Sequence, residues 1–178
     1  MAILYLEKQH FSRGRGNSVC AAAAYRSGSI VNDYYYGEVH NYTNKSDVCY
    51  TEIITPPGTP EEFNNREALW NIVEHCEQRK DARLANELRL ALPKEQSLEE
   101  HIPLVTEFVT ENLVKLGACV DMAIHDKGNG NPHSHVMFTS RTLINGTFGN
   151  KNRDLDTKEF LMSLHEQWAI ALSNSLKD

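Results

Sequence analysis

Three histidines fall within eleven consecutive positions, in the stretch IHDKGNGNPHSHVMF. If this stretch contains a strand, His133 and His135 point to the same side, because side chains two positions apart share a face. A hairpin through the turn KGNGNP would bring His125 beside them. Three imidazoles on one face of a sheet are the donor set of a divalent metal site with open positions for a substrate. The spacing therefore predicts a catalytic metal site, although an H-x-H pair alone would be a weak signal.

A tyrosine in the stretch AAAAYRSG is the second candidate for chemistry. The small residues around Tyr25 would leave its phenol accessible, and three arginines, Arg13, Arg15 and Arg26, could bind phosphate. A neutral phenol is a poor nucleophile and needs positive charge around the group that it attacks. A metal ion on three imidazoles would provide that charge at a phosphodiester. Together the two signals predict a covalent phosphotyrosyl intermediate on DNA, whereas a tyrosine on an alanine-rich helix is, by itself, more often a packing aromatic.

Three stretches of the chain, in the same order, resemble the N-terminal relaxase domain of MobA/MobL-type (MobQ-like) plasmid mobilisation proteins, which are HUH endonucleases. They are MAILYLEKQHFSRGRGNSVCAAAAYRSG, LWNIVEHCEQRKDARLANELRLALP and AIHDKGNGNPHSHVMFTSR. The resemblance implies a relaxase that nicks and rejoins one DNA strand at a plasmid origin of transfer. In such enzymes a tyrosine attacks the scissile phosphate, keeps the 5′-phosphate covalently and releases a 3′-hydroxyl.

The resemblance also assigns roles to individual residues. It implies that Tyr25 is the catalytic nucleophile and that the three histidines bind one divalent metal ion. Glu87 matches an acidic residue of the family's central strand, and its catalytic role is either to orient a histidine or to assist proton transfer. The residue between the paired histidines is Ser134, where the HUH pattern has a hydrophobic residue, but its side chain would point to the opposite face of the sheet.

Several properties of the implied enzyme follow. Imidazoles accept Mn²⁺ and Zn²⁺ readily while Mg²⁺ prefers oxygen, so we favour Mn²⁺, with Mg²⁺ as the cellular candidate and Zn²⁺ as the third. The expected partners are single-stranded or hairpin DNA at the origin of transfer, accessory relaxosome proteins and secretion coupling proteins. The start of the chain shows no export signal and no stretch is long enough to span a membrane, so we expect a cytoplasmic protein without membrane insertion.

Other functions remain open at this stage. Rolling-circle-type replication or transposition nucleases of the HUH superfamily are one alternative, although they place the histidine pair before the tyrosine. A DNA-hairpin-binding module that does not cleave is a second, and a metal-dependent hydrolase of small phosphodiesters is a third. The cluster Tyr34, Tyr35 and Tyr36 could provide additional nucleophiles, pack on the sheet or stack on DNA bases.

The elements that must position these residues can be read from periodicity and turn signals. The pattern predicts an α+β domain of about five mostly antiparallel strands with helices packed on one face, the palm-like HUH/relaxase fold. Residues 34–43 and 48–54 are predicted to pair as a hairpin through NKSD. A single relaxase domain over residues 1–178 is expected, either as a whole protein or as the N-terminal part of a longer one. The predicted strands are 2–9, 34–43, 48–54, 87–93, 118–126 and 133–141, and the predicted helices are 19–28, 61–78, 97–116 and 157–176.

The charge of the chain at first argues against a nucleic-acid ligand. Its 178 residues are 40% hydrophobic and 24% charged, as in a globular protein, with a net charge of -6. However, residues 56–121 contain thirteen acidic residues and seven basic residues, and this difference accounts for the whole net negative charge of the chain. The segments that contain Tyr25 and the three histidines each have equal numbers of acidic and basic residues. We therefore predict a polarised molecule with an acidic helical back and a locally positive cleft.

Overall fold

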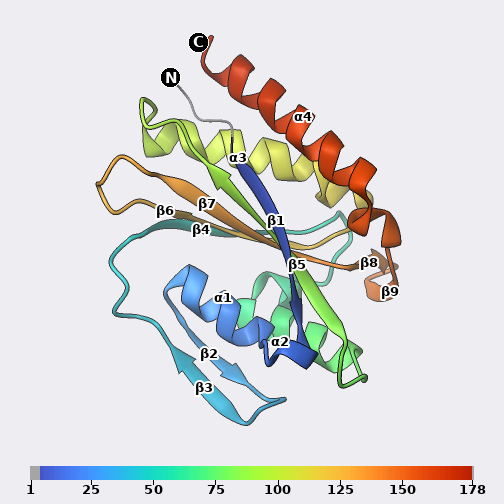
Figure 1. Cartoon of the computed structure of the whole chain (residues 1–178). Coiled ribbons are helices and arrows are strands. Elements are labelled where there is room, and N and C mark those ends of the chain that lie inside the picture. The colour runs from blue at the N-terminus through green and yellow to red at the C-terminus, as the bar shows by residue number, and fades with distance from the viewer. Residues whose placement is uncertain (1–4, 178) are drawn as a thin grey trace.

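A computed structural model describes residues 5–177 (Figure 1). Within this range no helix is long and apolar enough to cross a membrane. Short 3-10 turns, including Arg13–Arg15 and Glu61–Asn64, connect some of the main elements. In chain order these are β1 (Leu6–Ser12), α1 (Val19–Ser27), β2 (Ile30–Asp33), β3 (Glu38–Asn41), β4 (Val48–Ile54), α2 (Arg66–Cys76), β5 (Arg83–Ala91), α3 (Leu98–Asn112), β6 (Val120–His125), β7 (His133–Thr139), β8 (Arg141–Ile144), β9 (Thr147–Lys151) and α4 (Lys158–Ser175).

The main sheet has five strands in the order β1-β5-β7-β6-β4, and each neighbouring pair is antiparallel. The α+β class and the five-stranded antiparallel sheet are thus as predicted. β6 and β7 form the expected hairpin, and β5 lies beside β7 on its other side. The first residues of the predicted strand 2–9 lie outside the described residues, and β1 extends to Ser12, further than expected. The histidine-bearing hairpin therefore lies inside the sheet, between β5 and β4.

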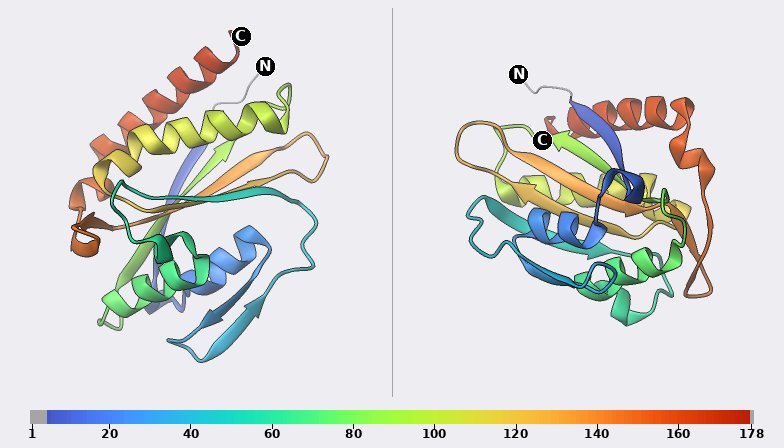
Figure 2. Two further views of the ribbon diagram at one scale, coloured as in Figure 1. Left: turned by 180° about the vertical axis from the view of Figure 1, so that it is seen from behind. Right: turned by 60° about the horizontal axis from the view of Figure 1, so that its bottom comes forward.

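The helices cover both faces of the sheet, so the predicted packing on one face is wrong. Figures 1 and 2 show α3 and α4 on one side and α1 and α2 on the other. Strand β6 explains the difference, because all six of its residues are buried. Val120, Met122 and Ile124 join the core under α3 and α4, whereas Asp121 on the alternate face bonds to α2. A strand buried on both faces requires a helical layer on each.

Two further predictions about local structure are wrong. β3 pairs with β2 through a turn around Gly37, while β4 pairs with β6 at the edge of the main sheet. Residues 42–47 are therefore a crossing loop and not a hairpin turn. The expected helix 61–78 is interrupted, because the side chain of Asn65 accepts a hydrogen bond from the Ala68 backbone and starts α2 there. Sequence analysis also missed the β8–β9 hairpin, although its turn Asn145-Gly146 carries the positive φ angles that such pairs favour.

The second helical layer is fixed to the sheet by a buried carboxylate. Asp121 on β6 is 6% exposed and accepts two hydrogen bonds from the Arg66 guanidinium, at 2.7 and 2.9 Å. It accepts a third from Trp70 Nε1 at 2.9 Å. Both donors belong to α2, so this one side chain anchors that helix against the face of the sheet that carries the histidines.

Removing this anchor tests its contribution to stability. Asp121→Ala leaves the Arg66 and Trp70 donors without their acceptor, and we expect the free energy of unfolding in urea to fall by about 3 kcal/mol. The matched control is Glu111→Ala, which removes the exposed ion pair with Lys115 and should cost less than about 0.5 kcal/mol. Equal losses for the two variants would contradict the anchoring role of Asp121.

Candidate active site

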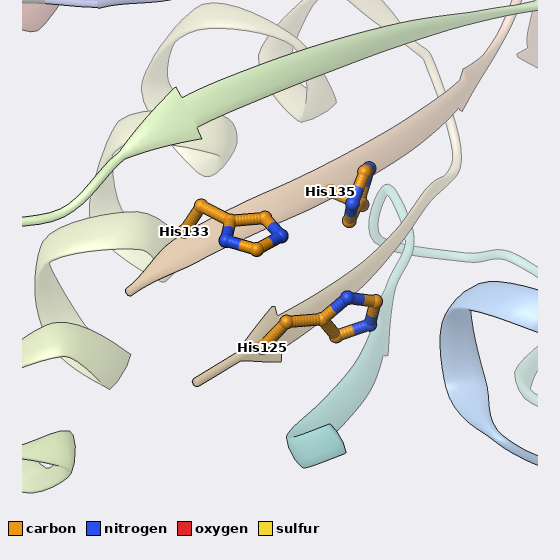
Figure 3. Close-up of side chains that lie close together, drawn as sticks. All are labelled: His125, His133 and His135. Carbon is orange, nitrogen blue, oxygen red and sulfur yellow. The ribbon is translucent and has the colours of Figure 1, made fainter. Parts of the chain in front are cut away.

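The β6–β7 hairpin brings the three histidines together on one face of the sheet (Figure 3). His125 pairs directly with His133, and His135 follows two residues along the same strand. The ring centroids are 4.8 to 5.4 Å apart, and one nitrogen from each ring lies within 4.8 Å of the others. This is the convergence that the H-x-H spacing and the hairpin predict.

Each of the three imidazoles has one nitrogen directed at an oxygen of the protein. His125 Nε2 donates to the carbonyl of Arg26 at 2.6 Å, and His133 Nδ1 lies 3.0 Å from the carbonyl of Asn131. His135 Nδ1 is buried without a hydrogen bond and faces a carboxylate oxygen of Glu87 at 3.4 Å. These contacts leave one nitrogen of each ring free for an ion. The residues therefore fit a divalent cation held by three imidazoles.

Burial keeps two of the rings in the form that binds metal. Burial lowers the pKa of His125 to about 4, although the hydrogen bond to the Arg26 carbonyl partly opposes the shift. Burial also lowers the pKa of His133. Both imidazoles are therefore neutral near pH 7, as coordination requires.

Glu87 lies on β5, 1% exposed, behind the histidines. Its carboxylate accepts hydrogen bonds from the Arg26 guanidinium through Nε and Nη2 and from Gln9 Nε2 at 2.5 Å. Burial alone would raise the pKa of Glu87, but the contacts with His135 and Arg26 outweigh it and lower the pKa to about 2. Glu87 is therefore ionised near pH 7 and contacts one histidine of the three.

Helix α1 places Tyr25 next to this group. The Ser18 side chain caps the helix start by accepting from the Ala21 backbone, and Gly28 ends the helix in the left-handed conformation. Tyr25 lies in the last turn and is 47% exposed. Because His125 bonds to the carbonyl of Arg26, the residue that follows Tyr25 is in direct contact with the histidine cluster. The structure thus brings together Arg26, Glu87 and the three histidines, and Tyr25 is the neighbour of Arg26 in the chain.

The predicted phosphate-binding role is wrong for Arg13. Its side chain is buried, pairs with Glu74 at 2.8 Å and donates to the carbonyls of Glu77 and Arg79. It therefore joins α2 to the 3-10 turn after β1. Arg26 is paired with Glu87, whereas Arg15 is exposed and has no hydrogen bond or ion pair within residues 5–177.

The tyrosine cluster lies in the β2–β3 turn, at the other end of α1. Tyr34, Tyr35 and Tyr36 are exposed, so they do not pack on the main sheet. The hydroxyl of Tyr34 bonds to Glu67, and that of Tyr36 bonds to the carbonyl of Asn17, just before α1. Helix α1 has nine residues, which separates this turn from the histidines by about 13 Å or more.

Sequence reasoning missed three residues at the site. Gln9 on β1 supports Glu87, and Asp47 and Lys45 come from the crossing loop 42–47. Only the pairing of β4 with β6, which no local pattern revealed, brings that loop to the site.

The fold and the site together have two defining features. They are a five-stranded antiparallel sheet with three clustered imidazoles and a tyrosine on the first helix beside it. A family model described as the MobA/MobL family matches residues 17–176. The chain belongs to the MobA/MobL family.

Individual relatives agree with this assignment. The conjugal transfer protein TraA of Rhizobium radiobacter is 36% identical over 161 residues, covering 85% of this chain and 14% of that protein. The mobilization protein MobL of Acidithiobacillus ferridurans is 31% identical over 182 residues, covering 88% of this chain and 47% of that protein. The chain thus spans less than half of the length of these relatives.

Two solved structures share the fold. One, from work on the molecular basis of vancomycin resistance transfer in Staphylococcus aureus, has a TM-score of 0.91 and 32% identity, covering 97% of this chain and 92% of that one. The metal-bound conjugative relaxase TrwC in complex with oriT DNA has a TM-score of 0.60 at 14% identity, covering 97% of this chain and 70% of that one. The second likeness concerns the fold alone.

Substituting the paired histidines tests the metal site. The double variant His133→Ala/His135→Ala removes two of three imidazoles, so we expect no stoichiometric binding of Mn²⁺ in calorimetry. His165→Ala, an exposed histidine on α4, should bind like the wild type. Unchanged stoichiometry in the double variant would place the metal elsewhere.

Glu87→Gln tests the support of His135 in two ways. Loss of the anion should weaken metal affinity about 10- to 100-fold. The lowered pKa of Glu87 stabilises the wild-type fold above the ordinary glutamate pKa of 4.5, and this stabilisation is lost as pH falls toward about 2. Urea unfolding at stepped pH should therefore show a loss of stability between these values that is smaller in the variant. If the free energy of unfolding falls with pH by the same amount in the wild type and in Glu87→Gln, the ion pairs of Glu87 do not contribute to stability.

Proposed function

We propose that this chain nicks and rejoins one strand of DNA at a plasmid origin of transfer, in a site- and strand-specific, metal-dependent reaction. The carrying observation is the hydrogen bond from His125 to the carbonyl of Arg26, which fixes the helix end that bears Tyr25 against the histidine cluster. Family membership and the fold shared with relaxases support the proposal.

The reaction is a transesterification at phosphorus. The Tyr25 phenol oxygen forms a bond to the scissile phosphorus while the bond from phosphorus to the 3′-oxygen breaks. The phenol loses its proton and the departing 3′-oxygen gains one, so the products are a 5′-phosphotyrosyl linkage and a free 3′-hydroxyl. No water is consumed and one phosphoester replaces another, so attack by a 3′-hydroxyl restores the strand and Tyr25.

His125, His133 and His135 would hold a divalent ion at this site. When bound, the ion supplies Lewis-acid stabilisation of the charge on the non-bridging phosphate oxygens. We propose Mn²⁺ as the ion, with Mg²⁺ as the cellular candidate and Zn²⁺, which imidazoles bind more tightly than either, as the third. Arg15 is the exposed arginine of the original set and remains a candidate phosphate contact, while Arg26 contributes through Glu87.

The charge distribution supports a DNA strand that runs along the sheet. At the end of β5 and β7 opposite His133, two adjoining concavities of about 650 and 520 Å³ are lined by five bases against three acids. Six residues of β7 separate this end from His133, a distance of about 20 Å. In this proposal a DNA hairpin binds at the basic end of the sheet, and the strand is nicked at the histidine end. The bases are Arg79, Arg83, Arg141, Lys151 and Arg153.

The back of the molecule has the opposite charge. Between α3 and α4 a groove is lined by several glutamates of the α3 side, including Glu100, Glu107 and Glu111, and by no lysine or arginine among the described residues. This arrangement supports DNA binding away from α3 and α4. The predicted polarity holds only in part, because α2, the other helix of the acidic segment, lies on the face of the sheet that carries the histidines. The reaction on plasmid DNA would take place in the cytoplasm, with accessory relaxosome and secretion coupling proteins as partners.

Tyr25→Phe tests the nucleophile. The variant lacks the attacking oxygen, so it should form no SDS-resistant adduct with a single-stranded DNA pool while binding the same DNA with unchanged affinity. Tyr34→Phe, which removes another exposed phenol, should form the adduct at the wild-type rate.

The outcomes of this assay separate the alternatives. A persistent adduct in Tyr25→Phe would refute the assignment of the nucleophile. DNA binding by the wild type without an adduct under Mn²⁺, Mg²⁺ or Zn²⁺ would favour a non-cleaving hairpin-binding module. Turnover of a small phosphodiester without any adduct would favour a simple hydrolase.

A further inference from the structure

Two contacts orient the ring of Tyr25, one with another aromatic ring and one with a lysine ammonium over its face. The hydroxyl has no hydrogen-bond partner within residues 5–177, as suits a group that must reach a substrate. Instead, the Tyr42 ring packs against the Tyr25 ring in a T-shaped geometry, with centroids 5.2 Å apart. The ammonium of Lys45 lies 3.6 Å from the Tyr25 ring centroid. The direction of the phenol is therefore set by Tyr42 and Lys45.

Both residues belong to the crossing loop 42–47, which is anchored to α1 and to β6. At its start, the Tyr42 backbone donates to the carbonyl of Ser29, just after α1. At its end, the carbonyl of Asp47 accepts from the Asp126 backbone, and Val48 pairs with His125. The loop thus spans from the helix that bears Tyr25 to the strand that bears a histidine of the cluster.

A chain of polar contacts follows the same path, from an ammonium through a carboxylate to a neutral imidazole. Lys45 Nζ lies 3.7 Å from one oxygen of Asp47, and the other oxygen of Asp47 lies 3.9 Å from His125 Nδ1. The side chains of Lys45 and Asp47 are only 17% and 14% exposed. A lysine usually extends its ammonium into water, whereas this one is held between a carboxylate and an aromatic ring.

Gly28 allows the loop to approach the helix end this closely. Its φ of +64° is the left-handed conformation that favours glycine. A Cβ at this position would lie 3.3 Å from Val48 Cγ2 and 3.7 Å from Lys45 Cβ. The loop therefore packs directly on the turn that ends α1.

We propose that Lys45 is a positioning residue for the nucleophile, assisted by Tyr42. This inference rests on the proposed function and adds a residue to it. Lys45 contacts the ring of Tyr25 and takes no part in making or breaking bonds. It holds the phenol in one direction relative to the histidine cluster, to which Asp47 connects it. A freely rotating phenol would reach the in-line geometry less often, and the reaction at saturating DNA would be slower.

The test compares Lys45→Met, which keeps the length of the side chain without its charge, with Lys45→Arg, which restores a cation. Lys127→Met is the matched control, because Lys127 is an exposed lysine in the neighbouring β6–β7 turn. The probe is a 3′-fluorescent single-stranded oligonucleotide, selected from a random pool by covalent capture on the wild-type chain. Adduct formation is followed under single-turnover conditions over a range of protein concentrations.

We expect Lys45→Met to slow adduct formation at saturation at least about tenfold, with half-saturation within about twofold of wild type. Lys45→Arg should recover the rate to within about threefold, and Lys127→Met should match the wild type. An unchanged saturating rate in Lys45→Met overturns the proposal, as does a failure of arginine to restore it. A raised half-saturation with an unchanged rate would make Lys45 a DNA-phosphate contact instead.

A second measurement keeps the inference separate from the proposed function. In protein labelled with 3-fluorotyrosine, the ¹⁹F resonance of Tyr25 is assigned by its loss in Tyr25→Phe. It should shift in Lys45→Met and in Tyr42→Leu but not in Lys127→Met, without any DNA. If the wild type captures no oligonucleotide, the proposed function fails while this spectrum still tests the contact. An unshifted resonance in Lys45→Met overturns the positioning role, and Tyr42→Leu provides the test if Lys45→Met does not fold.

Discussion

Arg26 makes the contacts on which the rest of the site depends. Its carbonyl accepts the hydrogen bond of His125 on β6, and its guanidinium pairs with Glu87 on β5. Glu87 in turn faces His135 on β7. One residue at the end of α1 therefore bonds to two strands directly, and the carboxylate that it pairs with faces a histidine of a third. Because Tyr25 precedes Arg26, the same contacts that orient the histidines also locate Tyr25, the proposed nucleophile.

The composition of the two layers explains how a helix can lie this close to the sheet. On the face of β6 that carries the histidines, Asp121 lies under α2, where it bonds to Arg66 and Trp70. Further along the same strand, Ala123 pairs with His135 in register and occupies little volume. Helix α1 buries three alanines against this layer. Large side chains thus fill this face near Asp121, whereas small side chains near Ala123 let α1 approach the sheet.

The sequence contained strong local signals for the histidine hairpin and for α1. The H-x-H period, the turn KGNGNP, the Ser18 cap and Gly28 each depend on neighbours within a few residues, so they could be read without a fold. Arg13 could not be read in this way, because its acceptors lie 61 or more positions away along the chain. Lys45 looked like part of a polar turn for the same reason. Its role depends on the pairing of β4 with β6, and β pairing between distant segments has no local code. The face on which a helix packs is equally non-local, which is why a second helical layer was not predicted.

Two roles were proposed for Glu87, and the low pKa of its carboxyl supports the one in which it orients a histidine. A carboxylate with a pKa of about 2 holds protons weakly, and its oxygens already accept from Gln9 and Arg26 and face His135. Such a group is a poor acceptor for a phenolic proton. Its negative charge is instead suited to holding a protonated Nδ1 of His135 in place, which directs the other nitrogen toward an ion. In this arrangement the buried charges orient the histidines, whereas Tyr25, the proposed nucleophile, is exposed and its hydroxyl has no hydrogen-bond partner within residues 5–177. This division of roles has a physical reason. The side chains that must stay fixed are buried and paired, whereas the proposed reacting side chain must be accessible to DNA.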